Sequence, residues 1–263
     1  MNNIIILGAG ESGLGSALLA KRNEYEVFVS DSSKISDLVK NKLVESGIDF
    51  EENSHQKAKT IKPDFIVKSP GISDENDIVK FFISISVKII SEIEFASLHC
   101  NSKIIGVTGS NGKTTTTTLA YKLISEGGYN CTISGNIGKS FSSVCENDID
   151  FSIVEVSSFQ LDGIESFKPH IAILTAITPD HLDRYKNFEA YVESKFKIIK
   201  NQSEKDYLIY DSDCETIDSY IKSNKIKSRL LPFSIKKKVD QGAYFFNNEI
   251  KIITEKNKIN MPT

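Results

Sequence analysis

The chain has 263 residues, enough for two domains, and its 40% hydrophobic and 25% charged residues are ordinary for a globular protein. The formal net charge of −3 excludes the strong basic excess of typical nucleic-acid-binding proteins. No stretch approaches the roughly 20 apolar residues of a membrane helix, and four dispersed cysteines without a CxxC pair argue against a zinc site or a disulfide framework. We therefore expect a soluble cytoplasmic protein that binds neither nucleic acid nor membrane.

Short apolar runs alternate with helix-patterned segments in the first part of the chain. Strands are predicted at residues 3–8, 25–31 and 87–91, and residues 64–72 are predicted to be a strand that runs into a Pro-Gly turn. Helices are predicted at 12–22 and 33–47. This β-α-β alternation predicts a parallel sheet covered on both faces, in a Rossmann-like N-terminal domain.

The same pattern restarts after residues 97–102, so we predict domains at 1–98 and 99–263. Further strands are predicted at 103–109, 129–135, 150–156, 170–177 and 206–213, with helices at 113–126 and 188–201. Residues 242–263 are typical of a β-hairpin turning at "NNE", with no helix after it to cover the last strands. We expect an incomplete P-loop-type central ATPase domain with a parallel sheet, which leaves apolar surface or a strand edge exposed.

The first glycine-rich loop is "GAGESG", in which Gly8, Gly10 and Gly13 fit G-x-G-x-x-G between a strand and a helix. Asp31 ends the second strand, where a ribose-binding carboxylate is expected. These residues alone suggest a dinucleotide-binding oxidoreductase, and a nucleotide-like ligand is favoured over a plain strand-to-helix turn. Glu11 fits less well, because it sets a negative charge beside the expected pyrophosphate.

The second loop is "TGSNGKTT", again between a predicted strand and helix. Its backbone amides would surround phosphate oxygens, Lys113 would reach the terminal phosphates, and Thr114 would bind Mg²⁺. The general consensus places its first glycine at position 107, which is Val107 here, whereas Gly109 lies only three residues before Gly112. The loop is therefore a variant phosphate-binding loop.

Three polar residues further along the chain are candidates for the same site. Glu155 ends a strand predicted beside the phosphate loop, so Mg²⁺ ligation is favoured over a surface role. His181, between Asp180 and Asp183, fits a metal or phosphate contact and a structural role equally well. Lys195 lies on an amphipathic helix, a pattern that indicates an ordinary solvated lysine.

Together these stretches resemble the muramyl ligase family, the ATP-dependent amide ligases of bacterial cell-wall assembly. "SPGI" (69–72), "TGSNGKTT", "SGNIG" (134–138), "EVSSFQL" (155–161) and "DHLDRY" (180–185) carry the resemblance, which runs through the whole chain. It implies that ATP phosphorylates the terminal carboxylate of UDP-N-acetylmuramoyl-L-alanine, and that the amine of D-glutamate attacks the acyl phosphate. A sister ligase adding another amino acid is the nearest alternative.

The resemblance also assigns roles to individual residues. It implies an ATP site at Gly109, Ser110, Asn111, Gly112, Lys113, Thr114 and Thr115. It implies two Mg²⁺ sites, with Thr114 and Glu155 at the first and His181 at the second. Lys195 matches a family lysine that reacts with CO₂ to give a metal-binding carbamate, which requires the neutral amine that burial favours. The UDP-substrate positions are Glu11, Ser12, Asp31, Ser32, Gly71, Asn136 and Ser157.

Two other functions stay open at this point. A nicotinamide-dependent oxidoreductase would explain "GAGESG" and Asp31, and a P-loop switch without enzymatic activity would explain only the second loop. The resemblance further implies a monomeric full-length form with a third domain that contributes to ATP and D-glutamate binding. We therefore expect the 263 residues alone to bind the UDP-substrate, to bind ATP weakly and not to ligate.

Overall fold

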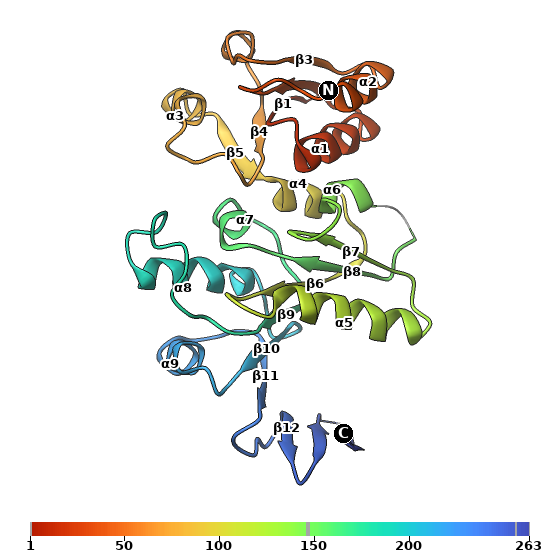
Figure 1. Cartoon of the computed structure of the whole chain (residues 1–263), viewed down its shortest axis with the longest axis vertical. Helices are drawn as coiled ribbons and strands as arrows, with labels where there is room; N and C mark the ends of the chain where they lie inside the picture. The colour runs from red at the N-terminus through yellow and green to blue at the C-terminus, as the bar shows by residue number, and fades with distance from the viewer. Residues whose placement is uncertain (1, 146–147, 256, 263) are drawn as a thin grey trace. The chain divides into compact units, whose positions relative to one another are not determined.

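Figure 1 shows the computed structural model of the chain, which describes residues 2–145, 148–255 and 257–262. The chain forms two compact units. The first comprises Met1–Ser102, Ser134–Ile149 and Phe159–Phe167, and the second comprises Lys103–Ile133, Asp150–Ser158 and Lys168–Thr263. Two later segments therefore pack with the first unit, and the predicted domain limits of 1–98 and 99–263 stay a prediction.

The first unit contains a five-stranded parallel sheet of order β3-β2-β1-β4-β5. Its strands are β1 (Asn3–Leu7), β2 (Glu26–Ser30), β3 (Asp49–Glu51), β4 (Phe65–Lys68) and β5 (Lys88–Ser91). The strand order reverses between β1 and β4, and open sheets of this kind bind ligands at the carboxyl ends of the strands next to such a reversal.

Helices cover this sheet on both faces. The helices of the first unit are α1 (Glu11–Arg22), α2 (Asp37–Glu45), η1 (Ala58–Thr60), α3 (Asp77–Ser84), α4 (Glu92–Leu98) and α6 (Phe141–Val144), and α7 (Ser158–Asp162) lies mostly in it. Ile5 and Leu7 of β1 pack with Phe82 of α3 on one face, and α1 packs against β1 and β2. Neither β3 nor α3 is among the predicted elements: β3 is only three residues long, and α3 consists mostly of β-branched and aromatic residues typical of strands.

The second unit is built on a sheet of order β14-β13-β12-β11-β10-β9-β6-β8-β7. Pairing is parallel from β8 through β6, β9, β10 and β11 to β12, and antiparallel from β12 to β14. The strands are β6 (Lys103–Thr108), β7 (Cys131–Gly135), β8 (Phe151–Glu155), β9 (Ile171–Leu174), β10 (Tyr207–Asp211), β11 (Arg229–Ser234), β12 (Gly242–Phe246), β13 (Glu249–Ile253) and β14 (Lys258–Pro262). The predicted hairpin is confirmed, with Asn247 and Asn248 in its turn at φ 54° and 58°.

Helices lie on opposite faces of this second sheet. They are α5 (Lys113–Glu126), α8 (Phe188–Phe196), η2 (Lys197–Ile199) and α9 (Glu215–Ser223). Ile105 and Val107 of β6 pack with α5, whereas Gly106 faces Ile198 of η2 on the other side. The predicted class is therefore confirmed: a Rossmann-like unit followed by a unit with a phosphate loop and a parallel sheet.

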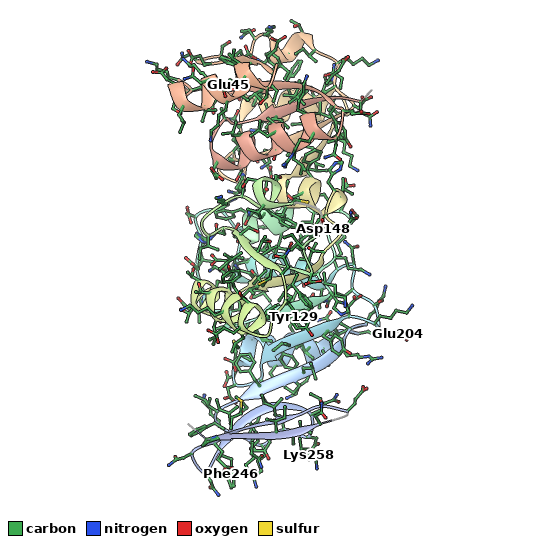
Figure 2. All side chains as sticks on the ribbon, turned by 90° about the vertical axis from the view of Figure 1, so that its right-hand side faces the viewer. Glu45, Tyr129, Asp148, Glu204, Phe246 and Lys258 are labelled. Carbon is green, nitrogen blue, oxygen red and sulfur yellow. The ribbon has the colours of Figure 1, made fainter. Side chains whose placement is uncertain are left out.

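Apolar side chains are exposed on the hairpins β12–β14, as expected from the sequence. Phe245, Phe246, Ile259 and Met261 are between 38% and 46% exposed, and Phe246 is labelled in Figure 2. Within the described ranges, no helix combines the length and the hydropathy needed to span a bilayer.

Two buried glutamates of α4 accept hydrogen bonds from later segments of the first unit, and their pKa values shift in opposite directions. Oε1 of Glu92 accepts a hydrogen bond from the Ser142 amide at 2.5 Å, while Oε2 is buried with no partner among the described residues. Burial raises the pKa of Glu92 to about 7. Burial also acts to raise the pKa of Glu94, but hydrogen bonds from the Ser166 hydroxyl and from the amides of residues 165–167 outweigh it and lower that pKa.

The shifted pKa values of Glu92 and Glu94 predict opposite effects of pH on the free energy of unfolding. Because the pKa of Glu92 is higher in the folded chain than its ordinary 4.5, its stabilisation is complete below pH 4.5 and is lost as the pH rises towards 7. We expect Glu92→Gln to raise the free energy of unfolding relative to the unaltered chain, and this gain to be about 2 kcal/mol larger at pH 8 than at pH 5. Urea unfolding at the two pH values measures it.

Glu94→Gln is the matched control on the same helix. The lowered pKa of Glu94 gives a stabilisation that is present at neutral pH and lost as the pH falls through the folded value. This variant should therefore be less stable than the unaltered chain at pH 8, and the difference should shrink in acid. Equal effects of Glu92→Gln at both pH values would contradict the assigned cost of its buried charge.

Candidate active site

The loop between β6 and α5 is pressed against the turn that follows β9. Gly109 has φ 151°, and a Cβ on this residue would lie 2.1 Å from Oγ1 of Thr175 and 2.9 Å from the carbonyl oxygen of Ala176. The amide of Ser110 donates to the same Ala176 oxygen at 2.6 Å. Only glycine fits position 109, because any side chain would push the loop away from the turn.

Side chains fasten the loop to this turn at further points. The Ser110 hydroxyl donates to the carbonyl of Thr178 at 2.9 Å and accepts from its amide at 3.0 Å. Oγ1 of Thr175 donates to the carbonyl of Asn111 at 2.6 Å. The loop then enters α5 through Gly112, which caps the helix at φ 80°. Backbone amides at the start of a helix suit a phosphate group.

Two predicted metal ligands meet beside the loop. Oγ1 of Thr114, in the first turn of α5, donates to Oε2 of Glu155 at 2.8 Å. Glu155 ends β8 and is only 1% exposed. A hydroxyl and a carboxylate at this distance provide the hard oxygen ligands that Mg²⁺ prefers when phosphates complete its shell.

The ammonium groups of two lysines converge on one carbonyl of the loop. Nζ of Lys113 donates to the carbonyl oxygens of Gly109 and Ser110, each at 2.9 Å. Nζ of Lys195, on α8, also donates to the Gly109 oxygen at 2.9 Å, and it lies 3.4 Å from Oγ1 of Thr108. Lys195 is 2% exposed, so the interpretation of its pattern as a solvated lysine is wrong.

Tyr191 belongs to this site and was not singled out by the sequence patterns. It is 1% exposed, and its hydroxyl lies 3.0 Å from Oγ of Ser110. Its ring centroid is 5.2 Å from Nζ of Lys195 and 6.2 Å from the ring of His181. Burial raises the pKa of Tyr191. Its position four residues before Lys195 on a helix is the signal that could have found it.

His181 lies at the more open side of this group. Its side chain is 45% exposed, its Nε2 is 3.5 Å from Oδ2 of Asp180, and its backbone has a φ of 52°. The structure places it near Tyr191, and its role as a metal ligand stays a prediction. In the part of the chain that is described, no three His, Cys, Asp or Glu side chains gather as a metal site.

Asp31 holds the first glycine loop in place. Its Oδ2 accepts from the amide of Ala9 at 2.7 Å, and its Oδ1 accepts from the amide of Ser33 at 2.8 Å. Ser32 lies between these contacts and is exposed. The carboxylate therefore links the end of β2 to the loop after β1, and its contact with a UDP-substrate stays a prediction.

Glu11 contacts the segment that follows β7. Its Oε1 lies 3.3 Å from the amide of Ser140 and 3.4 Å from Oγ of Ser143, at the start of α6. The other predicted substrate positions lie as follows: Ser12 in the first turn of α1, Gly71 in the turn after β4, Asn136 between β7 and α6, and Ser157 between β8 and α7. Their contacts with a substrate stay predictions.

Known proteins similar to this chain cover nearly all of it. It is 49% identical over 262 residues to the UDP-N-acetylmuramoylalanine–D-glutamate ligase of Christiangramia forsetii, a match covering 99% of this chain and 59% of the relative. It is 43% identical over 263 residues to the protein of the same name from Bacteroides fragilis, with the same two shares. The chain thus spans about 59% of the length of these curated relatives.

A solved structure shares the fold. The UDP-N-acetylmuramate:L-alanyl-gamma-D-glutamyl-meso-diaminopimelate ligase from Neisseria meningitides matches with a TM-score of 0.67 at 17% identity, over 98% of this chain and 86% of that one. Residues 3–78 match the profile described as MurD N-terminal domain, and residues 107–262, more than half of the chain, match the Mur ligase middle domain. With the phosphate loop and its Thr114–Glu155 contact in place, the chain belongs to the Mur ligase family.

Proposed function

We propose that this chain serves an ATP-dependent ligase that joins D-glutamate to UDP-N-acetylmuramoyl-L-alanine in peptidoglycan precursor synthesis. The contact between Oγ1 of Thr114 and Oε2 of Glu155, 2.8 Å apart beside the loop of Gly109, is the observation that carries the ATP chemistry. The names of the relatives at 49% and 43% identity support D-glutamate as the added amino acid. We place the protein in the cytoplasm and propose a monomer.

The residues of the loop suit a nucleotide phosphate held with Mg²⁺. Bound ATP supplies the phosphoryl group that activates the carboxylate of the substrate as an acyl phosphate. Lys113 is anchored on two loop carbonyls, where its charge can offset the charge of phosphate oxygens. Thr114 and Glu155 would provide oxygen ligands for Mg²⁺, and the amides at the start of α5 would donate to the phosphate. The amine of D-glutamate then attacks the activated carbonyl carbon, and phosphate leaves as the amide forms.

We propose further that Lys195 functions as a carbamate. The ammonium would first lose one proton to solvent. The neutral amine would then attack the carbon of CO₂, forming an N–C bond while one C=O π pair moves onto oxygen and a second proton leaves to solvent. Over both steps the side chain would change from positive to negative, which would replace the repulsion between two ammonium groups at the Gly109 carbonyl with attraction to Lys113. With His181, this carbamate would bind a second Mg²⁺. The 2% exposure of Lys195 supports the proposal, because burial disfavours an ammonium ion.

The Thr114 contact can be tested with a matched pair of variants. Thr114→Val keeps the shape and the β-branch but removes the hydroxyl, and Thr118→Val makes the same change one turn further along α5. We expect the first variant to weaken Mg²⁺-dependent ATP binding about tenfold, as the loss of one ligand implies, and the second to have no effect. Calorimetric titration with Mg²⁺ and with a chelator measures both. Equal affinities for the two variants would contradict the Mg²⁺ role.

Carbamate formation predicts a signal from labelled carbon. In the presence of ¹³C-labelled bicarbonate, the chain should show a carbamate resonance by NMR that is absent in Lys195→Ala and retained in Lys197→Ala. The signal should disappear when CO₂ is removed. A Lys195 that stays unmodified in CO₂-saturated buffer with Mg²⁺ and ATP would refute the carbamate.

The 263-residue chain should bind its substrate without turning it over. Because its match covers only 59% of the relatives, we expect binding of UDP-N-acetylmuramoyl-L-alanine, weak binding of ATP and no release of ADP dependent on D-glutamate. Titration calorimetry and an ADP assay measure these properties. ADP release that depends on D-glutamate would contradict the prediction for the isolated chain, and tighter binding of NADH than of the UDP-substrate would contradict the proposed function.

A further inference from the structure

Lys68, the last residue of β4, folds its side chain back onto the turn that follows its own strand. Nζ donates to the carbonyl oxygen of Ile72 at 2.7 Å and lies 2.9 Å from Oδ1 of Asp74. The lysine side chain is 11% exposed, whereas that of Asp74 is 63% exposed. The cation of this ion pair is therefore shielded from solvent, whereas its anion is solvated. Of the two contacts of Nζ, the hydrogen bond to the Ile72 carbonyl is the better protected.

One side of this turn packs on the first glycine loop. The amide of Ser69 donates to the carbonyl of Leu7 at 3.0 Å, and the amide of Ile72 donates to the carbonyl of Ser69 at 3.1 Å. Gly8, at φ 90°, lies so close that a Cβ on it would be 2.7 Å from Oγ of Ser69. This Ser69 oxygen is buried and has no hydrogen-bond partner among the described residues. A hydrogen-bonding group thus faces the loop where a diphosphate is expected.

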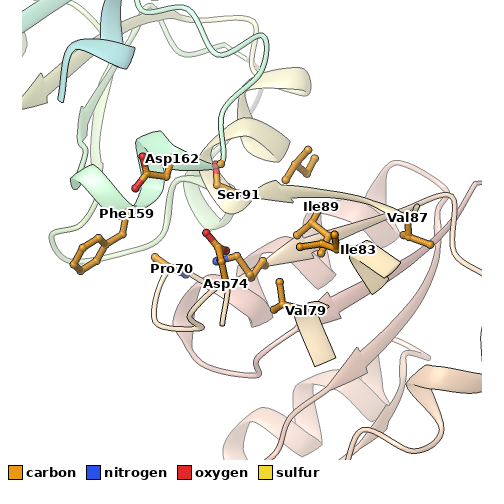
Figure 3. A pocket seen from close by; sticks show the side chains of 12 residues that line it. Pro70, Asp74, Val79, Ile83, Val87, Ile89, Ser91, Phe159 and Asp162 are labelled. Carbon is orange, nitrogen blue, oxygen red and sulfur yellow. The ribbon is translucent and has the colours of Figure 1, made fainter. Parts of the chain in front are cut away.

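The other side of the turn faces a cavity of about 260 Å³ within the first unit. In Figure 3, Pro70 and Asp74 of the turn lie across this cavity from Phe159 and Asp162. Lys68 also lines the cavity. Because a cavity provides no packed side chains to support the turn from this side, the two bonds of Lys68 take the place of core packing.

We propose that Lys68 is a positioning residue for the nucleoside-diphosphate substrate, and this proposal depends on the proposed function. By tying the end of β4 to Ile72, its ammonium holds the Ser69 hydroxyl against the glycine loop. Its charge is already balanced by Asp74 and a carbonyl, so it acts through geometry and not by attracting the anionic substrate.

The test compares Lys68→Met with a control, Lys80→Met. The control breaks an exposed ion pair between Lys80, which is on α3, and Glu75. We expect Lys68→Met to weaken binding of UDP-N-acetylmuramoyl-L-alanine about tenfold, a typical loss for a charged hydrogen bond. ATP affinity should stay as in the unaltered chain, and Lys80→Met should bind normally. An effect of less than twofold, or a parallel loss of ATP binding, would overturn the proposal.

Salt and a second variant separate geometry from charge. The loss in Lys68→Met should be the same at 0.1 M and at about 0.5 M NaCl, where exposed charges are largely screened. Asp74→Asn should bind within about twofold of the unaltered chain, because the bond to Ile72 remains. A loss that vanishes in high salt, together with tighter binding by Asp74→Asn, would make Lys68 a direct electrostatic contact and overturn the positioning role.

Hydrogen exchange keeps the test independent of the proposed function. The amide of Ile72 should exchange faster in Lys68→Met than in the unaltered chain and in Lys80→Met. If the unaltered chain fails to bind the UDP-substrate, the proposed function is wrong, while faster exchange still supports the tether. Unchanged exchange of Ile72 overturns the tether whatever the binding result.

Discussion

The second unit depends on one backbone oxygen, the carbonyl of Gly109, that accepts hydrogen bonds from two lysines on different helices. The arrangement exists because position 109 has no Cβ, which lets the loop touch the turn after β9. One lysine comes from the helix that the loop starts, and the other comes from α8, far along the chain. Two ammonium groups at one carbonyl oxygen repel each other and attract anions. A phosphate group beside them, or a carbamate in place of one of them, would reduce that repulsion.

The sequence predicts much of this second unit and misses its closest contacts. Strand, loop and helix around "TGSNGKTT" follow from local pattern, and Glu155 follows from its place at the end of a strand. Lys195 could not be placed in the same way, because its partner, the carbonyl of Gly109, is 86 residues away, and no helical periodicity reports which residue of another element it meets. Tyr191 cannot be identified from the sequence for the same reason. An aromatic residue on an amphipathic helix is typical of the core, and only the structure shows the hydroxyl of Ser110 beside it.

In the first unit, the sequence locates the loops correctly but leaves the contacts of their side chains undetermined. Asp31 suits a ribose contact by its position, yet the structure shows both of its oxygens accepting backbone amides. Glu11, which looked misplaced beside a pyrophosphate, contacts the start of α6. Lys68 has no motif at all, since its contact depends on how four residues of a turn fold back. Local pattern fixes where a loop begins, whereas the direction of a side chain depends on what packs around it.

The first unit is assembled from three separate stretches of the chain, and this division has a consequence for synthesis. Glu92 and Glu94 both lie on α4, but their partners are Ser142 and residues 165–167. On the ribosome, the first hundred residues emerge with these two carboxylates lacking their native partners. Domains usually fold in order from the N-terminus during synthesis. The first unit cannot follow that order, because its folding cannot finish before part of the second unit has been synthesised. It must wait until Phe167 has left the exit tunnel, by which time the phosphate loop of the second unit has already emerged.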